Sequence, residues 1–266
     1  MTRFDHDRYL PIQSELDRAF DYPYEAPSGA FVFTNGGLAP LEDASILSGR
    51  TAVLSVGSNR APVQLRRKFG DAAVIPMTPA ILHDCDIVHA AMLGYYGAVP
   101  ATAFASKGCD VSLNVAWLDD QQLVHMHRTE ALGVAYDYVE LNAGSVSHLP
   151  VSEAGGDIVP ATQIIYGYNA RSGVLDLGAG KPAGLATIPA TNRTNKSLSQ
   201  HEAATLVRQL TGHDDDRPMD VFIADMQGDR AARDAIIATL ANHALFDDNP
   251  PWRIVPVSLD DVEAFL

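Results

Sequence analysis

Cysteine, long apolar runs and positive charge are all scarce in this sequence. Only two of its 266 residues are cysteines, Cys85 and Cys109, too few for the disulfide framework of a small secreted protein. No apolar run approaches the length of a membrane span, and the N-terminus lacks the apolar core of a signal peptide. We therefore expect a cytoplasmic protein that makes no use of a membrane.

Basic residues are too few to balance the acidic ones. Lys and Arg total 19 against 33 Asp and Glu, which gives a formal net charge of −14. Binding to nucleic acids or to anionic lipids needs Lys and Arg to neutralise phosphates, so we expect neither partner. A small anionic substrate remains compatible, because the local potential of a site can differ from the net charge. Hydrophobic residues make up 47% of the chain, which predicts a sizeable folded core.

The chain divides into three segments by composition. Residues 1–48 form a leader interrupted by Pro and Gly, which we expect to pack on the core. Residues 49–145 carry the clearest strand and helix signals and are predicted to be the core. Residues 146–266, where the composition shifts to Gly, Ala, Pro and Asn over 150–194, are predicted to form a C-terminal α/β elaboration. The expected fold class is α+β.

Local patterns place the elements of the core. Strands are predicted at 51–56, 87–93, 101–105, 111–118 and 136–141. Pro62 suits a first helical turn and begins a helix predicted over 62–69. Asp119 and Gln122 form a capping box, which predicts a helix from 119 to about 131. In the last segment, strands are predicted at 164–166 and 185–188, and helices at 199–211 and 230–245.

One carboxylate lies on the apolar face of the second of these helices. Leu123, Met126, His127 and Glu130 recur at helical spacing, so Glu130 shares the face that packs inward. The C-terminal end of a helix carries partial negative charge, and burial removes water, so both disfavour a charged carboxylate there. Such a group is suited to accept a proton near neutral pH. The competing interpretation is a frayed helix end, with Glu130 in water or paired with Arg128.

The turn Gly57-Ser58-Asn59 follows the first core strand. A strand that stops at glycine and leads into a helix presents backbone N–H groups to one place, which suits an anion or a developing oxyanion. Gly57 lets the backbone approach a ligand closely, and Ser58 and Asn59 add polar side chains. An ordinary strand–helix connection would also explain the turn.

The turn and the carboxylate belong to a longer pattern. The turn, the segment from Gly97 to Thr102, strand 111–118, a helix ending in Arg-Thr-Glu130 and the Tyr136 strand resemble the γ-glutamylcyclotransferase-like family in order and spacing. The resemblance covers about residues 50–142. It implies a mixed β-barrel with flanking helices. It also implies an enzyme that acts without a cofactor on a small γ-glutamyl substrate, whose own α-amine attacks the γ-carbonyl and releases 5-oxoproline.

The resemblance also implies roles for particular residues. Glu130 corresponds to the general base, and the implied substrate-binding residues are Val56, Gly57, Ser58, Asn59 and Tyr136. Val56 departs from the family, which has a tyrosine there, so one hydrogen-bonding group of the pocket is missing. Two alternatives stay open: an amide hydrolase on the same scaffold, and a non-enzymatic small-molecule-binding protein. A homodimer is compatible with the sequence.

Two further groups of polar residues could have a function, one as a metal site and the other as part of a pocket wall. His83, Cys85 and His89 would share one strand face, but no fourth ligand has zinc-like spacing, so we predict no metal site. Arg193 and its asparagine neighbours suggest that residues 150–195 form a wall or lid over the pocket. That hypothesis requires this segment to lie near Glu130.

Overall fold

A computed structural model describes residues 4–149, 163–213 and 215–258 of the chain. In these ranges it is a mixed α+β protein with seven helices and a large mixed sheet, which confirms the predicted class. The helices are α1 (His6–Tyr9), α2 (Glu15–Phe20), α3 (Pro62–Phe69), α4 (Asp120–Thr129), α5 (Gln200–Leu210), α6 (Met219–Gly228) and α7 (Arg230–Leu240). Single 3-10 turns span Ala44–Leu47, Ser58–Arg60 and Ala241–His243.

The strands are short and numerous. The first eight are β1 (Phe31–Thr34), β2 (Gly37–Pro40), β3 (Thr51–Ser55), β4 (Ile75–Leu82), β5 (Cys85–His89), β6 (Ala101–Ala105), β7 (Asp110–Leu118) and β8 (Tyr136–Leu141). The others are β9 (Val146–His148), β10 (Ile165–Ala170), β11 (Val174–Leu175), β12 (Gly184–Leu185), β13 (Ala190–Thr191), β14 (Ser197–Leu198), β15 (Ala244–Leu245) and β16 (Trp252–Ile254).

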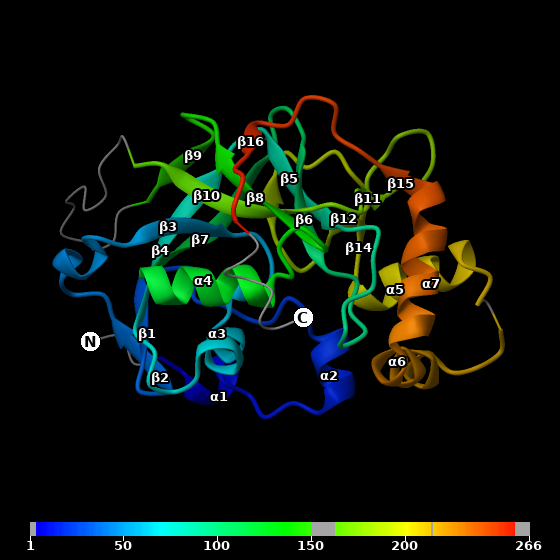
Figure 1. The fold of residues 1–266 in the computed structure, drawn as a ribbon, viewed down its shortest axis with the longest axis horizontal. Coiled ribbons are helices and arrows are strands. Elements are labelled where there is room, and N and C mark those ends of the chain that lie inside the picture. Colours follow the sequence, from blue (N-terminus) through cyan, green and yellow to red (C-terminus); the bar gives the residue numbers. More distant parts are fainter. Residues whose placement is uncertain (1–3, 150–162, 214, 259–266) are drawn as a thin grey trace.

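The main sheet runs in the order β16-β8-β10-β3-β7-β4-β1-β2, with β13 on β7 and β9 on β4 (Figure 1). Its pairings are antiparallel except for β10 and β3, which are parallel. A smaller sheet has the order β14-β12-β5-β6, and β11 pairs with β15. A closed barrel would need the two end strands of the main path to meet. Among the described residues no ladder joins β16 to β2, so the sheet is open.

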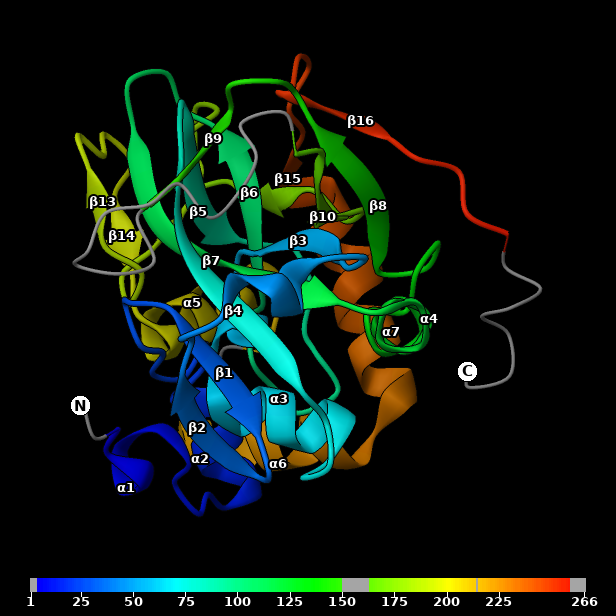
Figure 2. The same ribbon diagram turned by 90° about the vertical axis from the view of Figure 1, so that its left-hand side faces the viewer.

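The main sheet separates two apolar clusters, because successive side chains of a strand point to opposite faces. On one face, Val53 of β3 packs in a cluster with Leu65 of α3 and Met126 of α4. On the other, Leu54 belongs to a cluster that reaches Ile87 in the smaller sheet. All five side chains are at most 2% exposed. Figure 2 looks down the axis of α4 and shows the sheet beside it.

All three predicted segments contribute strands to the main sheet. From the leader, β1 pairs with β4, with Phe31 opposite Met77. From the C-terminal segment, β10 lies between β8 and β3, and β16 pairs with the outer side of β8. The stretch 49–145 therefore does not form a continuous sheet without its neighbours.

A group of helices covers one end of the molecule (Figure 1). Helices α2, α5, α6 and α7 contact one another around a third apolar cluster that includes Ala19, Phe222 and Leu240. No helix in the described ranges is both long and apolar enough to cross a bilayer.

Candidate active site

The Gly57-Ser58-Asn59 turn leaves the middle of the main sheet. Strand β3, between β10 and β7, ends at Ser55, and α3 begins at Pro62 after the 3-10 turn Ser58–Arg60. A Cβ added at Gly57 would lie 2.3 Å from the hydroxyl oxygen of Tyr22. Glycine is thus required here because a side chain from the leader occupies the adjacent space.

Helix α4 places Glu130 opposite this turn. Asp119 caps the helix and forms the predicted capping box with Gln122. Met126 is fully buried and fixes the inward face. The helix ends at Thr129, slightly before the predicted end, and Glu130 is its C-cap residue. The carboxylate therefore projects from the point where the helix gives way to the turn before β8.

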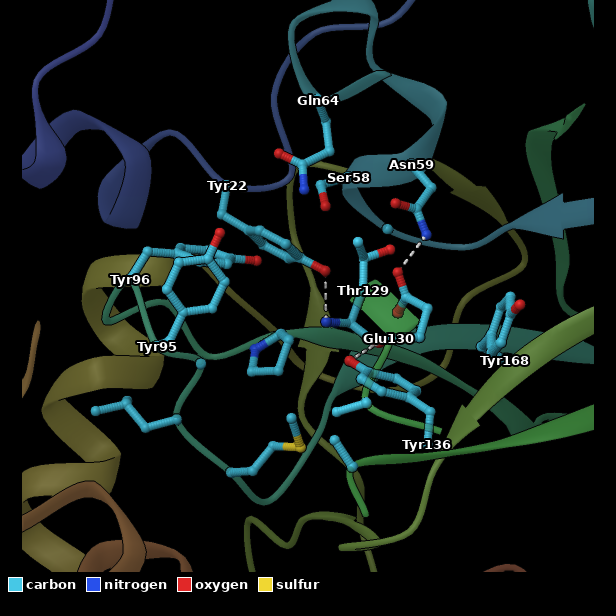
Figure 3. A pocket seen from close by; sticks show the side chains of 18 of the residues that line it. Tyr22, Ser58, Asn59, Gln64, Tyr95, Tyr96, Thr129, Glu130, Tyr136 and Tyr168 are labelled. Atoms are coloured by element: carbon cyan, nitrogen blue, oxygen red, sulfur yellow. Dashed lines mark hydrogen bonds between the residues drawn. The ribbon is translucent and has the colours of Figure 1, made fainter. Parts of the chain in front are cut away.

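A cavity of about 660 Å³ joins the two elements. All six residues implied by the resemblance line it: Val56, Gly57, Ser58, Asn59, Glu130 and Tyr136. Figure 3 shows the carboxylate of Glu130 pointing toward Asn59, with Tyr22 and Tyr96 on the other side of the view. Residues seventy positions apart in the chain thus share one pocket.

Two donors converge on one oxygen of Glu130. The Asn59 Nδ2 group donates to Glu130 Oε1 over 2.9 Å, and the Lys68 ammonium forms an ion pair with the same oxygen. The side chains of Lys68 and Glu130 are only 9% and 12% exposed. Glu130 is therefore a paired, nearly buried group rather than a frayed end in water. No described residue donates to its second oxygen, Oε2.

Asn59 offers an acceptor that the protein does not use. Because its Nδ2 donates to Glu130, its Oδ1 is fixed in the opposite direction, and this oxygen is buried without a hydrogen-bond partner among the described residues. A buried acceptor left unpaired costs about 1–3 kcal/mol.

Two tyrosines hold the peptide groups of Ala101 on the cavity wall. The Ala101 N–H donates to the Tyr22 hydroxyl over 2.8 Å, and the Tyr136 hydroxyl donates to the Ala101 carbonyl over 3.4 Å. Burial raises the pKa of both tyrosines above the usual range, so both hydroxyls are neutral at physiological pH. Tyr22 brings a phenol next to Gly57, where Val56 supplies none.

The charges around the cavity differ in sign from the rest of the chain. Its lining contains the cations Arg67, Lys68, Arg230 and Arg233 and the anions Glu130 and Asp234, so four minus two leaves +2, against −14 overall. Helix α7 supplies the two arginines with the higher numbers. The local potential therefore favours an anionic ligand.

The hypothesis that residues 150–195 form a wall of the pocket is wrong for Arg193, the residue on which it was based. Arg193 does not line the cavity; its guanidinium lies 2.8 Å from the Asp86 carboxylate, whose side chain is fully buried. From that segment the described lining includes Tyr168 alone, and α7 forms the wall instead. Residues 150–162 lie outside the described ranges.

The histidines have structural partners. The Tyr168 hydroxyl and His127 Nδ1 form a hydrogen bond of 2.7 Å, and burial lowers the pKa of His127 to about 4. His83 contacts Asp110 and Ser147. No three His, Cys, Asp or Glu side chains are placed to hold a metal ion within the described ranges.

Sequence reasoning missed Lys68 and Tyr22. Lys68 lies in the last turn of α3, and its backbone carbonyl is 2.6 Å from His125 Nε2 of α4. The available signal was that α3 directly follows the turn, which keeps its residues near the pocket. Tyr22 lies in an irregular stretch, and no local pattern there points to the site.

Comparison with known proteins gave no match to a protein-family model, a curated protein or a solved structure. The functional assignment therefore depends on the chemistry of the cavity.

Proposed function

We propose that this protein is a γ-glutamylcyclotransferase-like enzyme of the cytoplasm that releases 5-oxoproline from a γ-glutamyl compound. The observation that carries the proposal is the hydrogen bond from Asn59 to Glu130 across one cavity, which joins the turn to the carboxylate. Residues 49–145 would supply the core that resembles the family. In place of the family's closed barrel this core would form part of an open sheet, to which the leader and the C-terminal segment add strands.

The residues present suit each part of this reaction. The substrate α-amine would lie beside Glu130, and Glu130 Oε2 would take its proton. Attack of this amine on the γ-carbonyl of the same molecule closes a five-membered ring with little loss of translational entropy. The backbone of Gly57 and Ser58 would stabilise the negative charge that develops on the carbonyl oxygen.

The positive lining suggests the kind of leaving group. An amine or peptide that carries a carboxylate would be attracted by Arg67, Arg230 and Arg233. We expect kcat/KM for γ-glutamyl-alanine to exceed that for γ-glutamyl-ethylamine, which lacks only the carboxylate. The difference should shrink as ionic strength rises, because salt screens exposed charges.

Product analysis tests the proposed reaction. The protein is incubated with a panel of γ-glutamyl dipeptides and amines, and 5-oxoproline and glutamate are measured by mass spectrometry. 5-Oxoproline is the expected product. Free glutamate would indicate the amide hydrolase instead, and neither product across the panel would favour a binding protein.

The variant Glu130→Gln tests the base. The substitution is nearly isosteric and removes the basic oxygen, so we expect turnover to fall by at least about 100-fold. Glu140→Gln is the matched control, because Glu140 of β8 pairs with Arg253 of β16 and does not line the cavity. Full activity of Glu130→Gln would overturn the assigned role.

A further inference from the structure

Expulsion of the leaving group needs a proton as well as a base. When the α-amine attacks, its proton goes to Glu130, but the departing nitrogen must gain a proton before a basic amine can leave. Besides Glu130, the cavity contains a second ionisable group next to the proposed site of reaction, and this group can donate a proton. This is the Lys68 ammonium, paired with Glu130 Oε1.

We propose that Lys68 is the general acid that protonates the leaving nitrogen, an inference that rests on the proposed function. Lys68 lines the cavity, and its side chain is only 9% exposed, so bulk water has little access to it. It is also held in place: its carbonyl contacts His125, and its ammonium lies 3.6 Å from Met126 Sδ. These contacts hold the Lys68 ammonium beside the Glu130 carboxylate, which would receive the substrate proton.

The proton balance closes within the pair. A bond forms between the α-nitrogen and the γ-carbonyl carbon, and the α-nitrogen gives one proton to Glu130 Oε2. The bond from that carbon to the leaving nitrogen breaks as Lys68 Nζ gives this nitrogen a proton. Rotation of the Glu130 carboxyl group then brings its protonated oxygen to the neutral Lys68 amine and returns the proton, so the enzyme is restored without a proton from solvent.

Lys68→Arg separates proton donation from charge. An arginine keeps the positive charge and the ion pair with Glu130, but its guanidinium does not give up a proton in proteins. A merely electrostatic role for Lys68 would survive this change. Proton donation would not.

The test compares two substrates with different leaving groups. γ-Glutamyl-benzylamide releases a basic amine that must be protonated, whereas γ-glutamyl-p-nitroanilide releases a weakly basic nitrogen that needs no acid. For Lys68→Arg we expect kcat with the benzylamide to fall by about 100-fold or more, the usual contribution of a general acid, and to fall far less with the nitroanilide. In Lys68→Met we expect the same ratio between the losses of kcat on the two substrates. In addition, kcat should fall for both substrates, because the positive charge is also removed.

Three outcomes would overturn the proposal. Equal losses of the two substrates in Lys68→Arg, or full activity of this variant on the benzylamide, would show that Lys68 donates no proton while leaving the cyclising reaction intact. Absence of 5-oxoproline from both substrates with the unsubstituted protein would refute the proposed function and the role of Lys68 together.

Discussion

Replacing Gly57 with alanine tests how the leader is built into the site. The new methyl carbon would lie 2.3 Å from the Tyr22 hydroxyl oxygen and 3.2 Å from Cβ of Ala101. A Cβ atom does not persist closer than 3.0 Å to another heavy atom. The Tyr22 hydroxyl must therefore move away by about 0.7 Å, from 2.3 to 3.0 Å. Tyr22 is 3% exposed and packs against Tyr24 and Tyr96, which leaves it little room.

The magnitude follows from what the retreat breaks. The Ala101 N–H would lose its 2.8 Å bond to Tyr22, and a buried donor without a partner costs about 1–3 kcal/mol. Forcing a methyl group into a packed site adds about 1–3 kcal/mol. We therefore expect Gly57→Ala to lower the free energy of unfolding by about 2–6 kcal/mol.

A double-mutant cycle isolates the cause. In Tyr22→Phe the hydroxyl is absent, and the next atom of that ring is 3.4 Å from the added carbon, an ordinary contact. Adding Gly57→Ala to that background should then cost less than about 1 kcal/mol, which gives a coupling of at least about 1 kcal/mol. Urea unfolding of the four proteins, followed by circular dichroism, measures it. An equal cost in both backgrounds would refute the clash.

Three further predictions concern buried polar groups. His127 has a pKa of about 4 when folded and 6.5 when unfolded, so the unfolded state binds more protons between these values. The contribution of neutral His127 to the free energy of unfolding is then fully present above pH 6.5 and falls by about 3 kcal/mol toward pH 4. The free energy of unfolding of His127→Gln, measured with urea, should lack this part of the pH dependence. Arg193→Met leaves the fully buried Asp86 unpaired and should cost about 3–5 kcal/mol, with a smaller loss when Asp86→Asn is added. Burial raises the pKa of Cys85 to about 12 and also raises that of Cys109, so a thiol reagent should label neither until urea unfolds the protein.

Elements with their own local signals were predicted from the sequence. The helix predicted over 62–69 has those bounds, and strands 101–105 and 136–141 do as well. Pro62 begins that helix, and the capping box of Asp119 begins α4. Such signals involve residues only a few positions apart, so they act whatever the rest of the chain does.

Elements that depend on distant partners were missed or displaced. Strand β4 contains Pro76 and Pro79, which lack the N–H of a ladder bond and argue against a central strand. The structure nevertheless pairs β4 with β1, β7 and β9. The strand predicted at 87–93 is β5, Cys85–His89, because its partner β6 fixes the register. Helix α6 was not predicted at all.

The same division holds for the candidate site. The family resemblance in the order of the turn and the carboxylate predicted that Gly57 and Glu130 share a pocket, and both line the cavity. Tyr22, Lys68 and Arg233 reach it from the leader, from α3 and from α7. Their positions depend on how these elements pack, which no local spacing encodes.

In the proposed reaction the substrate amine, rather than water, attacks the γ-carbonyl. Turnover of γ-glutamyl-alanine in oxygen-18 water tests it most directly, because hydrolysis places a solvent oxygen in the product and cyclisation does not. We expect 5-oxoproline without the heavy isotope. Glutamate that carries one oxygen-18 atom would contradict it.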